Sequence, residues 1–225
     1  MDDRLKQMLP CVDHTLLSVT ATEYDFRVLC DEAVEYNVAS VCVPPTRVEF
    51  CANYLDGRVP VCTVVGFPNG YMLGHVKMYE TARAINQGAK EIDMVANISL
   101  IKEGAYSGVL AEIEMVKKTA EMCILKVIIE TCLLTDEEKI KMCKVVGESG
   151  ADYIKTSTGF AGGGATFDDV KLLREHSPAH VKVKAAGGIS SFEDAYKFIE
   201  FGAARLGTSK IVRLVQGMIA NCTLY

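Results

Sequence analysis

The sequence of 225 residues lacks the long apolar stretches and basic clusters that mark membrane and nucleic-acid-binding proteins. No apolar run approaches the roughly 18 residues that a membrane-spanning helix needs. Met1–Arg4 is polar and acidic, so we expect no signal peptide. The net charge is -5 and no Lys/Arg run is present, whereas nucleic-acid affinity depends on cations that neutralise phosphates. We therefore expect a soluble, cytoplasmic protein without nucleic-acid or membrane partners.

Cysteine is abundant, with nine residues, but the sequence has no C-x-x-C pair. Cys42 and Cys62 lie inside apolar runs, which indicates reduced cysteines in the core. The histidines are scattered, and Pro178 interrupts the one pair with helical i, i+4 spacing, His176 and His180. We expect no metal site.

The usual nucleotide-binding fingerprints are missing too, because no predicted strand is followed by G-x-G-x-x-G or G-x-x-x-x-G-K-[ST]. Instead, short runs rich in Val and Ile alternate with segments of helical periodicity. Strands are predicted over residues 40–43, 59–65, 91–96, 125–130, 153–157, 181–186 and 205–208, with 11–15 as a weaker eighth candidate. Helices are predicted over residues 22–36, 74–87, 105–121, 135–148, 166–176 and 191–200.

This alternation predicts parallel β-α units. Eight such units in a chain slightly shorter than the ~250 residues typical of a barrel favour a closed barrel over a doubly wound sheet. The composition is uniform, with no shift that would mark a linker. We expect a single domain over residues 1–225, a (β/α)8 TIM barrel with a short N-terminal helix. Its active face would lie at the carboxyl ends of the strands.

Two lysines near strand ends are the strongest chemical signal. Lys155 precedes Thr156–Gly159, and Lys184 precedes a Gly-Gly pair. Burial and a neighbouring like charge both lower the pKa of a lysine, which favours the free amine that forms a Schiff base. The alternative for either lysine is a side chain that reaches solvent at the strand end. Strand parity does not separate Lys184 from Lys182, and we prefer Lys184 because it lies nearer the strand end.

Two carboxylates stand inside predicted strands, Asp93 and Asp13. A buried carboxylate is usually paired, hydrogen-bonded or catalytic. Asp93 could shuttle protons, or it could form a structural ion pair, for example with Lys126. Asp13 has the same two interpretations, and the nearby Thr15 slightly favours the structural one.

Glycine-bearing turns follow the last three predicted strands, at residues 159–164, 187–188 and 207–209. Glycine lets backbone N–H groups approach an anion, and helices expected to begin near Thr166, Ser190 and Ser209 would add their positive N-terminal ends. Tight turns need glycine in any case, but three in one sector of a barrel favour a phosphate site.

Taken together, these segments resemble the deoxyribose-phosphate aldolase family over nearly the whole chain. The most specific segments are Lys155-Thr156-Ser157-Thr158-Gly159-Phe160 and the downstream Lys184-Ala185-Ala186-Gly187-Gly188. Further matching segments are Asp13-His14-Thr15-Leu16-Leu17, Val41-Cys42-Val43, Glu91-Ile92-Asp93-Met94-Val95, Val127-Ile128-Ile129-Glu130-Thr131 and Gly207-Thr208-Ser209.

The resemblance implies a class I aldolase that cleaves 2-deoxy-D-ribose 5-phosphate into acetaldehyde and D-glyceraldehyde 3-phosphate without metal or organic cofactor. It implies that Lys155 forms the Schiff base, that Lys184 holds the pKa of this nucleophile down, and that Asp93 relays protons with water. Family habit also suggests a homodimer.

The resemblance places phosphate-binding residues at Gly159, Gly187, Gly188, Gly207 and Ser209. Asp13, Cys42 and Thr158 are further candidates for the site. Some relatives end in a tyrosine that takes part in proton transfer, which makes Tyr225 a candidate.

Two residues depart from the family pattern. Phe160 stands where some relatives carry lysine, and Lys210 stands where a small residue is usual. The phosphate group would then be bound mainly by backbone amides, with Lys210 as a further candidate. Rival functions are another Schiff-base barrel, such as a transaldolase-like enzyme, and a barrel that binds sugar phosphates without catalysis.

Overall fold

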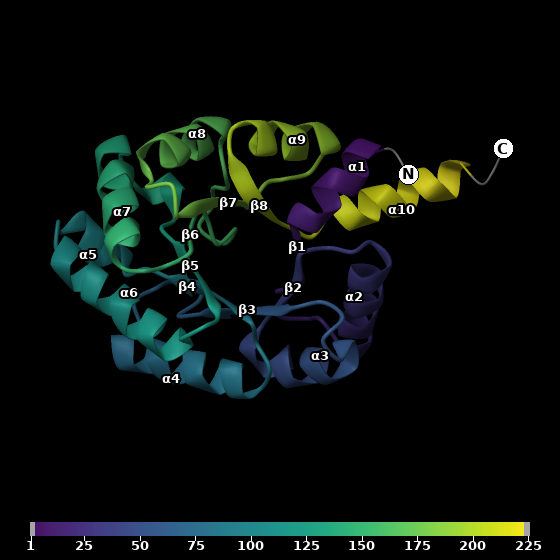
Figure 1. Cartoon of the computed structure of the whole chain (residues 1–225), viewed down its shortest axis with the longest axis horizontal. Helices are drawn as coiled ribbons and strands as arrows, with labels where there is room; N and C mark the ends of the chain where they lie inside the picture. Colours follow the sequence, from purple (N-terminus) through teal and green to yellow (C-terminus); the bar gives the residue numbers. More distant parts are fainter. Residues whose placement is uncertain (1–2, 223–225) are drawn as a thin grey trace.

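The computed structural model describes residues 3–222, in which strands and helices alternate along the chain (Figure 1). The strands are β1 Val12–Thr15, β2 Ser40–Val43, β3 Val61–Val65, β4 Glu91–Val95, β5 Ile124–Ile128, β6 Tyr153–Lys155, β7 Lys182–Ala186 and β8 Ala203–Thr208. The α-helices are α1 Asp3–Met8, α2 Glu23–Glu35, α3 Val48–Leu55, α4 Gly74–Asn86, α5 Ile98–Lys102, α6 Tyr106–Ala120, α7 Asp136–Glu148, α8 Phe167–His176, α9 Phe192–Glu200 and α10 Ile211–Cys222. Short 3-10 helices are η1 Leu9–Cys11, η2 Pro45–Arg47 and η3 Thr131–Leu133.

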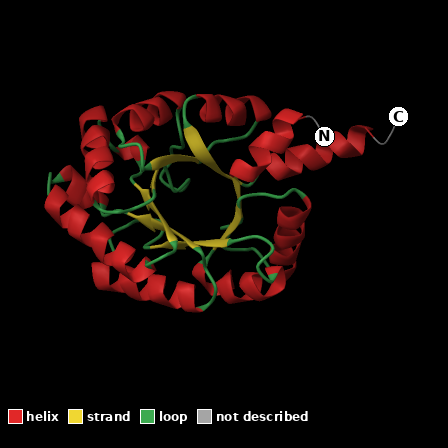
Figure 2. Cartoon of the chain, viewed as in Figure 1, coloured by secondary structure: helices red, strands yellow, loops and turns green. Residues whose placement is uncertain are grey.

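The eight strands form a closed parallel barrel in sequence order, surrounded by the helices (Figure 2). Closure joins β1 to β8, with Asp13 opposite Gly207 in the ladder. The predicted (β/α)8 barrel is therefore confirmed, including the weak eighth strand. Asp13 and His14 did not prevent β1 from forming, because both side chains have hydrogen-bond partners, Ser40 for Asp13 and Glu32 for His14.

The predicted strands have the right order but differ at their ends. The strand predicted over residues 125–130 ends at Ile128, since Glu130 adopts the left-handed conformation with φ of 53°. The strand predicted to reach residue 157 ends at Lys155. The strand predicted over residues 205–208 ends at Thr208 as predicted, although β8 begins earlier, at Ala203. The glycine turn assigned to residues 207–209 overlapped this strand, and it was wrong for Gly207, which still pairs with both neighbouring strands.

Helix starts agree more closely with the sequence because their caps are local. α7 follows Thr135, whose hydroxyl accepts a hydrogen bond from the Glu138 amide at 3.3 Å, while the Glu138 carboxylate accepts one from the Thr135 amide at 2.8 Å. Thr166 and Ser191 cap α8 and α9 in a similar way, each through its hydroxyl.

The sequence did not predict α3 or α5, and it placed only the start of a helix near Ser209, where α10 begins at Ile211. α3 and α5 have eight and five residues, too few turns to show a clear periodicity.

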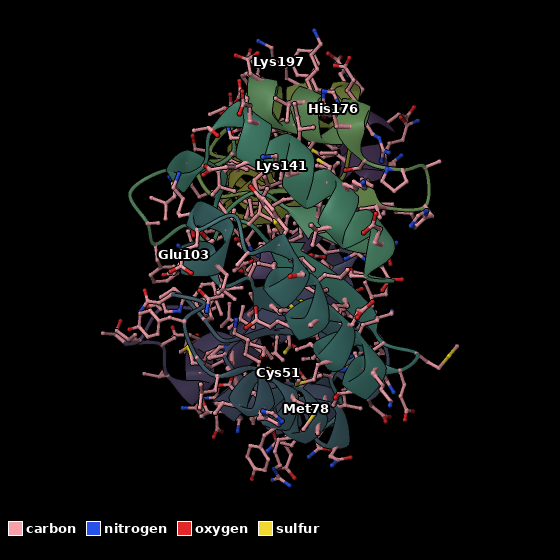
Figure 3. The ribbon with its side chains drawn as sticks, turned by 90° about the vertical axis from the view of Figure 1, so that its left-hand side faces the viewer. Cys51, Met78, Glu103, Lys141, His176 and Lys197 are labelled. Atoms are coloured by element: carbon pink, nitrogen blue, oxygen red, sulfur yellow. The ribbon has the colours of Figure 1, made fainter. Side chains whose placement is uncertain are left out.

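The main apolar core lies between the barrel and its helices. Outward-facing strand residues such as Ile92 and Val127 pack with helix residues such as Ile113 and Val116, and all four are fully buried. In Figure 3 the outer helices are stacked against one another, with the exposed residues Glu103, Lys141 and His176 on their surface. Among the described residues, no helix has both the length and the apolar character needed to cross a bilayer.

Candidate active site

The barrel interior brings together the three residues that the sequence singled out. Lys155 ends β6, Lys184 lies in the middle of β7, and Asp93 lies in the middle of β4. The ammonium groups of Lys155 and Lys184 donate to Oδ2 of Asp93, at 2.7 and 2.6 Å. Asp93 and Lys184 are fully buried, and Lys155 is 4% exposed. The two lysines therefore share one environment.

Electrostatics fix Asp93 as a carboxylate. Burial alone would raise the pKa of this carboxyl, but the ammonium groups of Lys126, Lys155 and Lys184 outweigh burial, and the pKa lies well below its usual range. Lys184 shows the converse, since burial disfavours its charge but Asp13 and Asp93 raise its pKa above the ordinary value. The predicted ion pair of Asp93 with Lys126 is also present, at 2.8 Å.

Among the interior cations of the described chain, Lys155 has the fewest carboxylates to balance its charge. Lys126 lies within 4 Å of three carboxylates, those of Asp13, Glu91 and Asp93. Lys184 contacts two, whereas Lys155 contacts only Asp93, through the oxygen that Lys184 also binds. Of these lysines, Lys155 is therefore the one whose positive charge has the fewest carboxylate neighbours.

Asp13 lies at the other side of this cluster. Its carboxylate accepts a hydrogen bond from Ser40 at 2.8 Å, lies 2.5 Å from the Lys184 ammonium, and contacts the Arg205 guanidinium. Burial opposes its charge, but Lys184, Lys126 and Arg205 lower its pKa. The Thr15 hydroxyl donates to the Asp13 carbonyl, not to the carboxylate. Asp13 thus holds Lys184 in place and does not contact Lys155.

The sequence did not identify Glu91 or Arg205 as members of this cluster. Arg205 donates to Glu91 at 2.8 Å, and Glu91 lies 2.6 Å from the Lys126 ammonium. One signal was available: Glu91 and Asp93 are two residues apart on one strand, so their carboxylates lie on the same face. In the same way, Arg205 shares a face with Gly207, which the resemblance placed in the phosphate site. Charged residues on one face of an apolar strand indicate a polar barrel interior. Alternation along a strand does not show which charged residues of different strands come into contact.

The structure decides between Lys182 and Lys184. Lys182 is exposed at the start of β7, with its ammonium 5.8 Å from the centre of the Tyr153 ring. An irregularity in the pairing of β7 with β8 falls between Val183 and Lys184. Lys182 therefore lies away from Asp93, while Lys184 contacts it.

An open cavity of about 430 Å³ lies above Lys155, at the carboxyl ends of the strands. Every glycine and serine proposed for phosphate binding lines it. Thr158, Phe160 and Lys210 also contribute, and Arg213, which the sequence did not single out, completes the wall. The residues in question are Gly159, Gly187, Gly188, Gly207 and Ser209.

Glycine is required at this wall for two reasons. Gly187 has φ of 83°, and a Cβ there would lie 3.0 Å from Gly164 Cα. A Cβ on Gly207 would lie 2.9 Å from the Ala186 methyl group and 3.1 Å from Lys184 Cε. Gly207 therefore leaves room for the Lys184 side chain to cross the barrel.

Two further candidates, Thr158 and Cys42, lie beside this cluster. The Thr158 amide donates to the Glu130 carboxylate at 3.2 Å, which holds the loop after β6. Cys42 is buried and is the direct strand neighbour of Cys62, whose thiol donates to Asp93 at 3.1 Å.

The two thiols and Asp93 are donor types that could hold a metal. However, the Lys126 ammonium already lies 3.3 Å from Cys62 Sγ and 2.8 Å from Asp93. A second cation there would be repelled. Tyr225 lies outside the described residues.

Comparisons with known proteins identify the family to which the chain belongs. A family model described as DeoC/LacD family aldolase matches residues 7–220. The chain is 52% identical over 212 residues to a deoxyribose-phosphate aldolase of Clostridioides difficile, with 94% of this chain and 97% of the relative covered. A deoxyribose-phosphate aldolase of Streptococcus pyogenes is 50% identical over 221 residues, with 98% and 99% covered.

Solved structures give the same result. A putative deoxyribose-phosphate aldolase from Coccidioides immitis superposes with a TM-score of 0.90 at 41% identity, covering 94% of this chain and 87% of that one. A deoxyribose phosphate aldolase from Aeropyrum pernix, described as having a unique tetrameric structure, superposes with a TM-score of 0.87 at 32% identity, covering 96% and 95%.

Proposed function

The chain belongs to the DeoC/LacD family of aldolases, and we propose that it reversibly cleaves 2-deoxy-D-ribose 5-phosphate to acetaldehyde and D-glyceraldehyde 3-phosphate. Lys155 is the Schiff-base nucleophile, Lys184 keeps a positive charge beside it, and Asp93 moves protons. The observation that carries these roles is the single oxygen of Asp93, to which both lysines donate, while Lys155 also lines an open cavity.

Charge balance supports Lys155 as the nucleophile. Three carboxylates, Asp13, Glu91 and Asp93, lie among four cationic side chains, which are those of Lys126, Lys155, Lys184 and Arg205. A neutral amine at Lys155 balances the buried charges. Lys155 also lines the cavity, whereas Lys184 is enclosed.

The Asp93 carboxylate begins the reaction as a base. The Lys155 amine attacks C1 of the open-chain sugar, and Asp93 takes the proton that the nitrogen releases, over the 2.7 Å that separates them. Asp93 then returns this proton to the departing hydroxyl group, which leaves as water. The product is an iminium ion linked to Lys155.

The iminium ion is the electron sink for cleavage, so the chemistry requires no metal or organic cofactor. Asp93, through a water molecule, takes the proton of the C3 hydroxyl group. The C2–C3 bond breaks, its electrons form an enamine, and D-glyceraldehyde 3-phosphate leaves. Protonation of the enamine at C2 and hydrolysis release acetaldehyde and the free Lys155 amine.

The phosphate group fits the far wall of the cavity. We assign its binding to the backbone of Gly159, Gly187, Gly188 and Gly207 and to Ser209. Positive φ values at Gly159, Gly187 and Gly188 allow backbone conformations that L side chains rarely adopt. Thr158 supports this wall through Glu130, and Cys42 is a neighbour of Asp93 through Cys62.

We further propose that residues 1–225 act as one catalytic domain, in the cytoplasm and as a homodimer. The family match over residues 7–220 supports a single domain. The cysteines of the described chain are free thiols, as is usual in a reducing compartment. Analytical ultracentrifugation at several concentrations tests the dimer, which a sedimentation coefficient of a monomer throughout would contradict.

Borohydride trapping tests the mechanism directly. Incubation with acetaldehyde followed by borohydride should leave one ethyl group on the peptide that contains Lys155, as read by mass spectrometry. The Lys155→Ala variant should carry no adduct and should lose turnover of the phosphorylated sugar by about 10⁴-fold or more. An adduct on another lysine, or release of a three-carbon ketol unit instead of acetaldehyde, would exclude this function.

A further inference from the structure

The wall of the cavity that faces Lys155 carries two cations that the family resemblance does not assign to a phosphate. Lys210 and Arg213 both line the cavity, and no Asp or Glu does so among the described residues. This pair therefore makes one wall of the cavity positively charged, and Lys155, the proposed nucleophile, lines the same cavity. Such an arrangement favours an anionic substrate.

Lys210 and Arg213 belong to one turn of helix. The Leu214 amide donates to the Lys210 carbonyl at 3.0 Å, so helical geometry begins at Lys210, just before α10. Residues three apart on a helix lie on the same face. Arg213 is exposed, so its guanidinium is accessible from the cavity.

The loop after β6 supplies no cation to the same region. Phe160 stands in this loop, and its ring packs edge-on against Phe67 with ring centres 5.2 Å apart. A cation that neutralises the phosphate must therefore come from another segment, and the first turn of α10 is the segment that provides it.

Arg213 also lines a neighbouring cavity of about 430 Å³, between the loop after β1 and α2. Asp25 and Glu32 lie in that cavity. Glu32 already accepts hydrogen bonds from His14 at 2.7 Å and from Gln216 at 2.9 Å. Burial raises the pKa of Glu32, but those two hydrogen bonds and the charges of His14 and Arg213 outweigh burial, so the pKa lies below its usual value. Hydrogen bonds at the start of α2 lower the pKa of Asp25, and Arg213 lowers it further. Arg213 thus lines both cavities, and within residues 3–222 no ion pair ties its guanidinium to Asp25 or Glu32.

We propose that Arg213 is a specificity-determining residue that binds the substrate phosphate through its guanidinium. This inference rests on the proposed function, because it assigns the phosphate end of the same substrate. A guanidinium presents parallel N–H groups that match two phosphate oxygens, whereas the Lys210 ammonium acts as a point charge. Arg213 therefore selects phosphorylated over unphosphorylated deoxyribose more strongly than Lys210 does.

The test compares the variants Arg213→Met and Lys210→Ala with the unmodified enzyme. The measured quantity is kcat/KM for 2-deoxy-D-ribose 5-phosphate divided by kcat/KM for 2-deoxy-D-ribose. Arg213→Met should lower this ratio by about 10-fold or more, and Lys210→Ala should lower it less. Arg83→Met is the matched control, since Arg83 is an exposed arginine on α4, away from both cavities, and its ratio should not change.

Two further measurements keep the outcome unambiguous. Calorimetric titration with inorganic phosphate should show about 10-fold weaker binding to Arg213→Met, whether or not the chain is an aldolase. Trapping with acetaldehyde, which has no phosphate, should still modify Lys155 in this variant if its active site is folded.

An unchanged ratio and unchanged phosphate affinity in Arg213→Met would overturn the inference, as would a larger effect from Lys210→Ala. Failure of the unmodified enzyme to cleave either sugar would instead refute the proposed function. The phosphate titration would then still decide the role of Arg213.

Discussion

Lys155 and Lys184 donate to the same carboxylate oxygen, Oδ2 of Asp93, from paired positions on neighbouring strands. One carboxylate oxygen cannot fully compensate two ammonium groups. Lys184 has a second carboxylate, Asp13, at 2.5 Å, and Lys155 does not. Charge on Lys184 therefore opposes charge on Lys155, and this asymmetry supports Lys155 as the proposed nucleophile.

Replacement of Lys184 by methionine should make Lys155 harder to deprotonate. With Lys184 removed, the ammonium form of Lys155 no longer shares Oδ2 of Asp93, and Lys126 binds the other oxygen, Oδ1. The pH at which acetaldehyde trapping reaches half its maximal rate should rise by about one unit or more. Trapping rates from pH 5 to pH 9 measure this shift.

Lys182→Met is the matched control for that experiment. Lys182 is exposed at the first position of β7, away from Asp93, so its loss should leave the pH profile of trapping unchanged. A profile for Lys184→Met that coincides with this control would show that Lys184 does not act on Lys155 through charge. Thermal melting of both variants identifies any loss of folding.

Asp93→Asn should affect both catalysis and stability. The amide keeps the shape of the carboxyl but leaves three buried ammonium groups, those of Lys126, Lys155 and Lys184, without the charge that they share. Turnover should fall by about 10²–10⁴-fold because the proton carrier is lost. The free energy of unfolding should fall by about 3–5 kcal/mol. Steady-state kinetics and urea titration measure the two effects, and turnover within about 10-fold of the unmodified enzyme would remove Asp93 from the proton relay.

Gly187→Ala should impair use of the phosphorylated sugar. A methyl group at φ of 83° is strained and lies 3.0 Å from Gly164, so the cavity wall proposed to bind phosphate must shift. We expect a loss of about 1–2 kcal/mol in stability and a clear rise in KM. Gly162→Ala is a useful comparison, since Gly162 has φ of 83° too but nothing lies within 4 Å of an added Cβ. Equal KM values for the two variants would argue against a role of the Gly187 wall in binding.

Stability should depend on pH through Asp13 and Asp93. Both carboxyls have a pKa below the usual value of about 3.9, so their contribution is complete above that value and is lost as the pH falls through the folded-state pKa values. Lys184 has a raised pKa, so its contribution persists up to at least about pH 10. Urea unfolding from pH 6 to pH 2 should show a steeper loss for the unmodified protein than for Asp13→Asn. Parallel curves would contradict this assignment.

Local patterns in the sequence were sufficient for the barrel. Alternating β-branched runs and helical periodicities predicted the strand order, and local caps such as Thr135 with Glu138 placed helix starts within a residue or two. α3 and α5 were missed because a helix of two turns or fewer has little periodicity. Strand ends were displaced where single backbone conformations, such as that of Glu130, end the ladder.

The sequence alone identified the candidate lysines, Asp93 and the glycine turns, because each can be recognised within its own segment. The lysines and Asp93 are charged residues in apolar strands, and the glycines follow strands. Tertiary structure decided which of Lys182 and Lys184 contacts Asp93, and it brought Glu91, Lys126 and Arg205 into one buried cluster. It also placed Arg213 on the cavity wall. The physical reason is that charge compensation acts through space between strands distant in sequence, and closure of the barrel sets those distances.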